Sequence, residues 1–354
     1  MSQVKIKKQL NRILSKEIKK SSNDNKIHLF IHSESTGVDI KLMADKNNGI
    51  YKSNESPYYI ASVGKLFTAV LIGILTEKKI LLYDDLISKY LEKDLLRGLH
   101  VYKEVDYSNE IRIKELLNQT SGLYDHWAPL LEKILSNPNF QKTPKEIIEW
   151  SKDNLNTLSV PGKKFNYSDT NYHLLGLIIE KVTQMPLYEA MKDYIFDPLH
   201  MNNSYYLHFS EAMEKNELSM DDFYIKGKKL KDYAAYANID YAGGGIVSTS
   251  EDLLKFMKAL VKGKIIKVNT FEKMKDWQSY GFGIDYGYGL MRFKTVPILM
   301  PKKFNIWGHA GATGAFMFYH PEMDTYLIGT FNDFDYEKKS IRVLFKVINK
   351  IYQY

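Results

Sequence analysis

Residues 57–78 of the chain read PYYIASVGKLFTAVLIGILTEK. The apolar run at 66–75 predicts a buried helix, because it is about half the length that a membrane span needs and charged residues follow it at once. Ser62 and Lys65 open this helix three positions apart, so their hydroxyl and amine share a face and lie within hydrogen-bonding reach. A lysine in apolar surroundings can accept the proton of a serine hydroxyl, which makes Ser62 a candidate nucleophile.

The Ser-x-x-Lys spacing by itself leaves a structural alternative open. Ser62 could instead be an N-cap whose hydroxyl accepts a backbone N–H at the start of the helix. The same spacing occurs at Ser2 and Lys5, in a polar tail that no apolar helix follows. Context, rather than spacing, therefore distinguishes Ser62 as the candidate for chemistry.

Outward from this helix, short β-branched and apolar runs at both ends of the chain predict strands, at residues 27–31, 38–43, 304–307, 315–319 and 326–331. Amphipathic patterns predict helices at 4–20 and 338–352, and 62–199 is mostly helical. The expected fold class is α+β: one antiparallel sheet built from both termini, flanked by terminal helices, with a helical domain inserted. We assign residues 1–60 and 235–354 to the sheet domain, and 61–234 to the helical domain that carries the nucleophile.

Composition excludes several classes of function. The 354 residues include no cysteine, which removes disulfides, thiol nucleophiles and cysteine-ligated zinc. The formal net charge is +7, but the lysines are scattered and no nucleic-acid-binding motif accompanies them. We therefore expect no nucleic-acid partner, although a basic adaptor protein remains an alternative that salt-sensitive DNA binding would reveal.

The first 26 residues are polar and lack the apolar core of a signal peptide. The chain as written is expected in the cytoplasm, or outside it if a leader was removed. We expect no membrane span, and the sequence leaves the oligomeric state open.

Other catalytic motifs are absent from the sequence. It contains no Gly-x-Ser-x-Gly elbow, no phosphate-binding loop and no His-Glu-x-x-His zinc pair. His28 and His32 could share a strand face, but without a third ligand at suitable spacing they are interpreted as structural. We expect neither a metal nor another cofactor.

The order of three segments resembles a known family. The class C β-lactamases and low-molecular-weight penicillin-binding proteins, with related esterases and D-amino-acid peptidases, carry Ser-x-x-Lys, then Tyr-x-Asn, then Lys-Thr-Gly or His-x-Gly. The corresponding segments here are 62–65, Tyr167-Ser168-Asp169 and His309-Ala310-Gly311. Connecting segments 116–123, 161–165 and 243–252 also look like the family, so the resemblance covers about 58–331 and implies a β-lactamase/transpeptidase-like fold.

By this resemblance, Ser62 would be acylated by the substrate, with Tyr167 close to Ser62 and Lys65. A tyrosine beside an ammonium group is stabilised as phenolate, so Tyr167 and Lys65 are expected to exchange the proton taken from Ser62. The alternative is that Tyr167 is a packed aromatic residue in a chain with 26 tyrosines.

The third segment would line the cleft. The resemblance implies an oxyanion hole made by the backbone N–H groups of Ser62 and Ala312, with Gly311 allowing close approach of the substrate backbone. His309 would orient the leaving group or carry a proton near neutral pH, or would be structural.

Two departures from the family pattern bear on the substrate. Asp169 replaces the usual asparagine, so a carboxylate would hold Lys65 protonated and repel a substrate carboxylate. His309 and Ala310 replace the lysine and threonine that engage the β-lactam carboxylate. We therefore expect a small-molecule or peptide ester or amide as substrate, with an amine near Asp169 as one hypothesis, and leave weak β-lactamase activity open. The alternative is a catalytically silent sensor or scaffold that binds penicillins or peptides.

Overall fold

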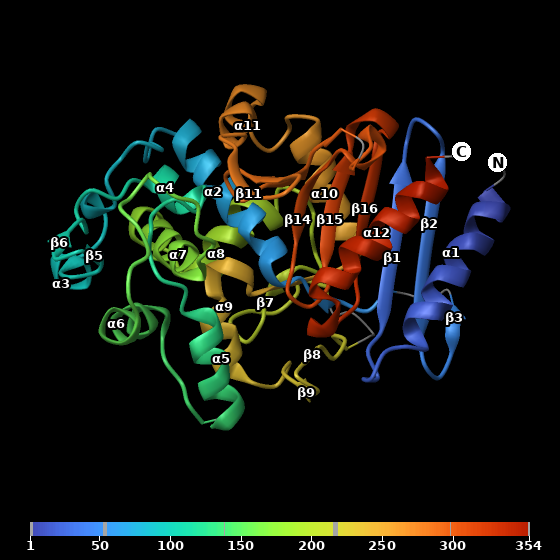
Figure 1. Ribbon diagram of the computed structural model, residues 1–354, viewed down its shortest axis with the longest axis horizontal. Coiled ribbons are helices and arrows are strands. Elements are labelled where there is room, and N and C mark those ends of the chain that lie inside the picture. Colours follow the sequence, from blue (N-terminus) through green and yellow to red (C-terminus); the bar gives the residue numbers. More distant parts are fainter. Residues whose placement is uncertain (1–2, 52–54, 138, 215–218, 298, 353–354) are drawn as a thin grey trace.

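The computed structural model describes residues 3–51, 55–137, 139–214, 219–297 and 299–352 (Figure 1). Its largest element is a nine-stranded antiparallel sheet with the order β11-β12-β13-β14-β15-β16-β1-β2-β3. Its strands are Ile27–Ser33 (β1), Val38–Asp45 (β2), Gly49–Tyr51 (β3), Gln278–Gly281 (β11), Ile284–Tyr286 (β12), Met291–Phe293 (β13), Ile306–Ala310 (β14), Phe316–His320 (β15) and Thr325–Thr330 (β16). Because β16 pairs with β1, strands from the two ends of the chain form one sheet.

This arrangement confirms the α+β prediction and the sheet built from both termini. Four of the five predicted strands correspond to β1, β2, β15 and β16. The prediction for residues 304–307 was wrong at its start, because Lys302–Phe304 forms a 3-10 turn and β14 begins only at Ile306. Pro301 initiates this turn by accepting a hydrogen bond from the Phe304 amide at 3.0 Å.

Helices cover both faces of the sheet. Helices α1 (Gln3–Ile18) and α12 (Glu337–Ile351) lie together on one face, as Figure 1 shows. Alternation along β1 turns Leu29 and Ile31 toward these two helices and Phe30 toward the other face. On that other face, α10 (Ser250–Val261) packs against β15 and β16. The sheet is thus buried between terminal helices and the rest of the protein.

The nucleophile segment lies in the helical region between β3 and β11. Helix α2 (Gly64–Glu77) is buried along almost its whole length, and Phe67 stacks on Phe256 of α10 with ring centroids 3.8 Å apart. The other helices are α3 (Lys93–Leu96), α4 (Ile113–Leu117), α5 (Trp127–Ser136), α6 (Pro144–Asn154), α7 (Asp169–Thr183), α8 (Leu187–Met191), α9 (Ala234–Gly244) and α11 (Val268–Met274). Helix α9 packs against α2, α5 and α7. The domain boundaries at 60/61 and 234/235 stay a prediction.

Short strands complete the description. A three-stranded sheet joins β4 (Tyr58–Tyr59), β10 (Ile246–Ser248) and β7 (Tyr205–Tyr206), and so fixes the backbone directly before the nucleophile. Two-stranded ribbons form from β5 (Val101–Tyr102) with β6 (Val105–Asp106), and from β8 (Tyr224–Ile225) with β9 (Lys228–Lys229). Within the described ranges, no helix is both long and apolar enough to cross a bilayer.

A buried ionic network connects β1 to the segment before β4. His28 is 1% exposed; its Nε2 donates to Asp221 Oδ2 at 2.6 Å, and its Nδ1 lies 3.4 Å from Glu55 Oε1. Asp221 Oδ1 also accepts hydrogen bonds from Ser56 Oγ and Lys26 Nζ, both at 2.7 Å. Burial lowers the pKa of His28, but the hydrogen bonds and charges of Asp221 and Glu55 outweigh burial and raise that pKa to about 9.

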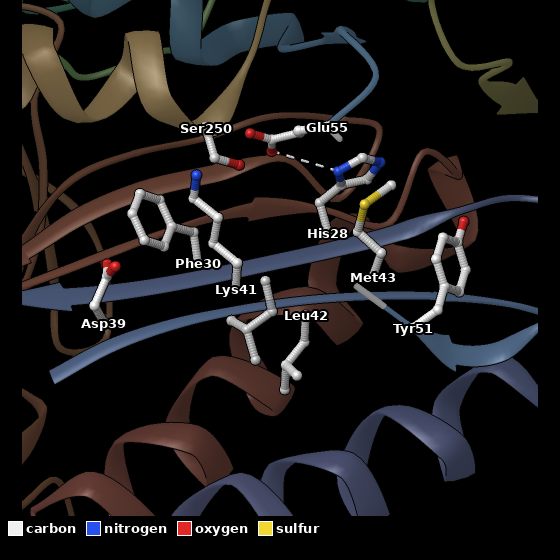
Figure 2. A pocket seen from close by; sticks show the side chains of 10 residues that line it. His28, Phe30, Asp39, Lys41, Leu42, Met43, Tyr51, Glu55 and Ser250 are labelled. Atoms are coloured by element: carbon white, nitrogen blue, oxygen red, sulfur yellow. Dashed lines mark ion pairs between the residues drawn. The ribbon is translucent and has the colours of Figure 1, made fainter. Parts of the chain in front are cut away.

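Figure 2 shows His28 and Glu55 at the wall of a cavity of about 210 Å³, with Lys41 and Tyr51 around it. His32 lies four positions further along β1, where its Nδ1 is 3.1 Å from Asp39 Oδ1. Each of the two histidines thus pairs with carboxylates at a different place on the sheet.

The His28 network predicts a pH-dependent stability. Because the folded-state pKa lies above the ordinary value of 6.5, the contribution of His28 is complete below pH 6.5 and is lost as the pH rises through about 9. We expect the free energy of unfolding to fall by roughly 3 kcal/mol over this interval. Urea unfolding at pH 6, 7.5 and 9.5 measures it, and the His28→Gln variant should lose the decline. Parallel pH profiles for the two proteins would contradict the assignment.

Candidate active site

Ser62 lies in a tight turn between β4 and α2. The turn is the 3-10 segment Ala61–Val63, in which Ala61 takes a left-handed φ of 47°, a conformation that costs energy in a residue other than glycine. The Ser62 Oγ accepts a hydrogen bond from Lys65 Nζ at 3.1 Å. The N-cap of α2 is Val63, and no side chain caps the helix, so the N-cap interpretation of Ser62 was wrong.

Lys65 is fully buried, and its ammonium group has three partners. Besides Ser62, it donates to the carbonyl of Gly243 at 3.0 Å and to Asp169 Oδ1 in a short ion pair. A Cβ at Gly243 would lie 2.7 Å from Asp169 Oδ1 and 3.2 Å from Lys65 Nζ, so glycine is needed for this approach. Three donors meeting three acceptors is the hydrogen-bonding pattern of a protonated lysine.

Tyr167 lies beside the same pair. Its ring centroid is 5.0 Å from Lys65 Nζ, and its hydroxyl hydrogen-bonds the Ser62 side chain. The expectation that Lys65 stabilises a phenolate was wrong. Burial raises the pKa of Tyr167 well above 10, the negative charge of Asp169 raises it further, and the hydrogen bond to Ser62 opposes this only in part. Tyr167 is therefore a neutral phenol in the resting site.

The end of β14 closes on the nucleophile turn. A Cβ at Gly311 would lie 2.6 Å from the Ile60 carbonyl oxygen and 3.2 Å from the Ser62 amide nitrogen. Ala312, the next residue, lines the same cleft as Ser62. This juxtaposition supports the expected oxyanion hole of Ser62 and Ala312 amides, which stays a prediction.

His309 is buried, although its neighbours Ala310 and Gly311 line the cleft with it. Its Nδ1 donates to the Ala310 carbonyl at 2.7 Å, so its Nε2 accepts from the Tyr286 hydroxyl at 3.1 Å. Burial and the charge of Lys65 lower its pKa to about 3. The expectation that His309 carries a proton near neutral pH was therefore wrong, because the ring is neutral there and both of its nitrogens are engaged within the protein.

Two acidic residues of the cleft were missed by the sequence analysis. Asp125 and Asp240 line the cleft, of about 540 Å³, together with Ser62 and Asp169. Asp125 comes two residues after the family-like segment 116–123, and Asp240 comes three residues before the glycines at 243–245. Proximity to these segments was the only available signal, since the turns that bring both carboxylates to Ser62 are not visible in the sequence.

The close approach of Gly311 predicts a steric effect on catalysis. In Gly311→Ala the new methyl group must displace the Ile60 carbonyl and the Ser62 amide. We expect a loss of stability of about 1–3 kcal/mol, typical of overpacking, and at least about a tenfold loss of Ser62-dependent esterase activity.

Gly281→Ala in β11 is the matched control, because a Cβ there meets no atom within 4 Å. Thermal unfolding and ester hydrolysis are measured for both variants. Equal behaviour of the two variants would show that β14 does not hold the nucleophile turn in place.

Comparison with known proteins gives related hydrolases. The chain is 27% identical over 276 residues to a penicillin-binding protein of Bacillus subtilis, covering 72% of this chain and 55% of that protein. It is 24% identical over 294 residues to a D-aminopeptidase of Brucella anthropi, covering 82% of this chain and 52% of that enzyme. The chain thus spans about half the length of the curated relatives it matches.

A solved D-amino acid amidase from Ochrobactrum anthropi shares the fold, with a TM-score of 0.78 at 20% identity over 99% of both chains. The family model for β-lactamase matches residues 23–344, which include both termini of the sheet and every predicted site residue. The protein belongs to the β-lactamase family.

Proposed function

We propose that this protein is a serine hydrolase that forms an acyl-enzyme at Ser62 with an ester, amide or peptide substrate. The observation that carries the proposal is the hydroxyl of Ser62, 3.1 Å from Lys65 Nζ and open to a cleft of about 540 Å³. Membership of the β-lactamase family and similarity to a D-aminopeptidase support hydrolysis of a carbonyl substrate.

Acylation needs a proton acceptor for Ser62. In the resting site Lys65 is ion-paired with Asp169. If the Lys65 proton moves to Asp169, the neutral amine accepts the Ser62 proton while Oγ bonds to the substrate carbonyl carbon. The Ser62 and Ala312 amides would hold the resulting oxyanion.

Collapse of the tetrahedral intermediate breaks the bond to the leaving amine or alcohol. The neutral phenol of Tyr167 is hydrogen-bonded to the Ser62 side chain. It is therefore placed to pass a proton to the leaving group and to recover one from Lys65. Attack of water on the ester at Ser62 then releases the acid and restores the serine.

The cleft is poorly suited to β-lactams with a carboxylate. Asp169 places a negative charge beside Ser62. His309 is neutral, and both of its ring nitrogens are hydrogen-bonded to groups of the protein. An uncharged or cationic ester or amide meets no such repulsion, so we infer that esterase, amidase or D-amino-acid peptidase activity exceeds β-lactamase activity.

One observation favours the silent alternative. The ammonium of Lys65 already donates to three acceptors, one of them the carboxylate of Asp169, so it has no lone pair with which to accept the Ser62 proton. A site fixed in this state would bind penicillins or peptides without turnover, and the following measurement separates the two candidates.

We expect hydrolysis of p-nitrophenyl acetate to depend on Ser62. Ser62→Ala should lower the rate by at least about a thousandfold, to the level of the uncatalysed reaction. Ser2→Ala is a matched control, because Ser2 has the same Ser-x-x-Lys spacing but lies outside the described residues. Intact-mass analysis should show one acetyl group on the wild type only. Equal rates for wild type and Ser62→Ala would leave the silent binder as the remaining candidate.

Asp169→Asn restores the amide of the family pattern. Removing one negative charge several ångströms from an anionic substrate should raise the kcat/KM ratio of a chromogenic cephalosporin to p-nitrophenyl acetate by about tenfold. The ratio cancels effects on Lys65 that both substrates share. An unchanged or lower ratio would show that Asp169 does not exclude β-lactams.

A further inference from the structure

The wall of the cleft near Ser62 has more carboxyl groups than it has ion pairs. Three aspartates, Asp125, Asp169 and Asp240, line the wall near Ser62. Asp169 is paired with Lys65. Within the described part of the chain, neither Asp125 nor Asp240 forms an ion pair with a lysine, arginine or histidine. Two carboxylates therefore face the cleft without a counter-ion.

Asp125 has one oxygen engaged and one available. Its Oδ1 accepts the backbone amide of Asp169 at 3.0 Å and that of Trp127 at 3.3 Å. Across the described residues no hydrogen bond reaches its Oδ2, and the side chain is only partly buried. The backbone contacts explain how Asp125 is held in place, but they leave its second oxygen free to bind a donor from the cleft.

Asp240 lies next to the nucleophile turn. A Cβ at Gly244 would be 2.9 Å from Asp240 Oδ2 and 2.8 Å from the carbonyl carbon of Ala61. The Asp240 carboxylate accepts Trp127 Nε1 at 2.7 Å and, in a short bond, the Tyr59 hydroxyl. Both donors are neutral, so the buried carboxyl group of Asp240 is hydrogen-bonded but has no directly paired cation among the described residues.

Titration of the two carboxylates agrees with this geometry. Burial raises the pKa of Asp125 and of Asp240, and the negative charge of Asp169 raises both further. Nearby His126 does not compensate them, because burial lowers its pKa. A cation bound beside these carboxylates would offset both the repulsion from Asp169 and the cost of burial.

The remaining walls suit an organic cation. The indole of Trp127 stacks near Phe334, with ring centroids 5.8 Å apart and planes at 21°. Both rings line the cleft, and an aromatic surface attracts an alkylammonium group and its carbon chain. The basic side chains that line the cleft, Lys338 and Arg342, come from α12 and are exposed.

We propose that Asp125 and Asp240, with Trp127, form a subsite that binds a primary ammonium group of the substrate. The inference rests on the proposed hydrolase function and assigns the amine to these two carboxylates rather than to Asp169, which Lys65 already occupies. Asp125 and Asp240 are thus specificity-determining residues, and the substrate class is an amino-acyl ester or amide.

The test compares p-nitroanilides whose acyl groups differ in charge. Phenylalanyl p-nitroanilide of either configuration carries an α-ammonium group, and 6-aminohexanoyl p-nitroanilide carries a distal one. Their neutral counterparts are 3-phenylpropionyl and hexanoyl p-nitroanilide.

The wild type should favour one or both ammonium substrates in kcat/KM. In Asp125→Asn and Asp240→Asn this preference should fall by about tenfold to a hundredfold, as expected for the loss of a charge-assisted hydrogen bond. The position of the preferred amine distinguishes an α-amino acyl group from an ω-amino acyl group.

Glu337→Gln is the matched control, since it removes the same charge from the cleft wall on α12. Its substrate preference should equal that of the wild type. An unchanged preference in both aspartate variants, or an equal fall in Glu337→Gln, would overturn the subsite. If none of these p-nitroanilides, charged or neutral, and no p-nitrophenyl acetate is turned over faster by the wild type than by Ser62→Ala, the proposed function fails instead.

A second measurement needs no aspartate variant. Phenethylammonium should inhibit wild-type hydrolysis of p-nitrophenyl acetate competitively, at least about tenfold more strongly than neutral 2-phenylethanol of similar shape. Inhibition should weaken at high salt, because it depends on charge. Equal inhibition by the amine and the alcohol would overturn the subsite even if the substituted proteins fail to fold.

Discussion

The site depends on one buried charge pair, Lys65 with Asp169. An ammonium group without exposure to solvent is stable only with partners that replace its hydration. Here those partners come from the nucleophile turn directly before α2, from the first turn of α7 and from a carbonyl of α9. Three segments that are far apart in the sequence must therefore meet at one nitrogen atom. Substitution of either ion-pair partner would leave the charge of the other partner buried alone. The ion pair therefore matters both for the stability of the fold and for the proposed chemistry.

Glycines make this meeting possible. A Cβ at Gly243 of α9 would fall within 3 Å of the Asp169 carboxylate, and one at Gly244 would fall within 3 Å of the Ala61 backbone. A Cβ at Gly311, after β14, would fall within 3 Å of the Ile60 carbonyl oxygen. The nucleophile turn is enclosed on two sides by backbone rather than by side chains. Its position is consequently set by chain geometry that is much stiffer than side-chain packing, and the unfavourable φ of Ala61 can persist there.

The sequence was informative where a pattern is local. The alternation in β1 and β2, the amphipathic terminal helices and the apolar α2 all follow from spacing within a single segment. Strands β11 to β13 were missed because they are three or four residues long and are separated by glycines, so no alternation develops.

In the site, local spacing identified Ser62 and Lys65, and family order added Tyr167, Asp169 and the segment at 309–312. Protonation was predicted poorly, as His309 and Tyr167 illustrate, because burial is a property of the folded environment and outweighs charges inferred from neighbouring motifs. Asp125 and Asp240 were missed for the same reason, because only the folded structure brings the two carboxyl groups into one cleft.

The pairing of β16 with β1 has a consequence for biosynthesis. Strand β1 is synthesised about 300 residues before β16, one of its two neighbours in the sheet. Throughout translation of the intervening helices, β1 therefore has a free edge, and the apolar surfaces of α1 and α2 lack part of their final cover. Such a topology is slow to close and exposes the nascent polypeptide to wrong associations. Protection of this edge until β16 has been made should therefore raise the yield of correctly folded protein.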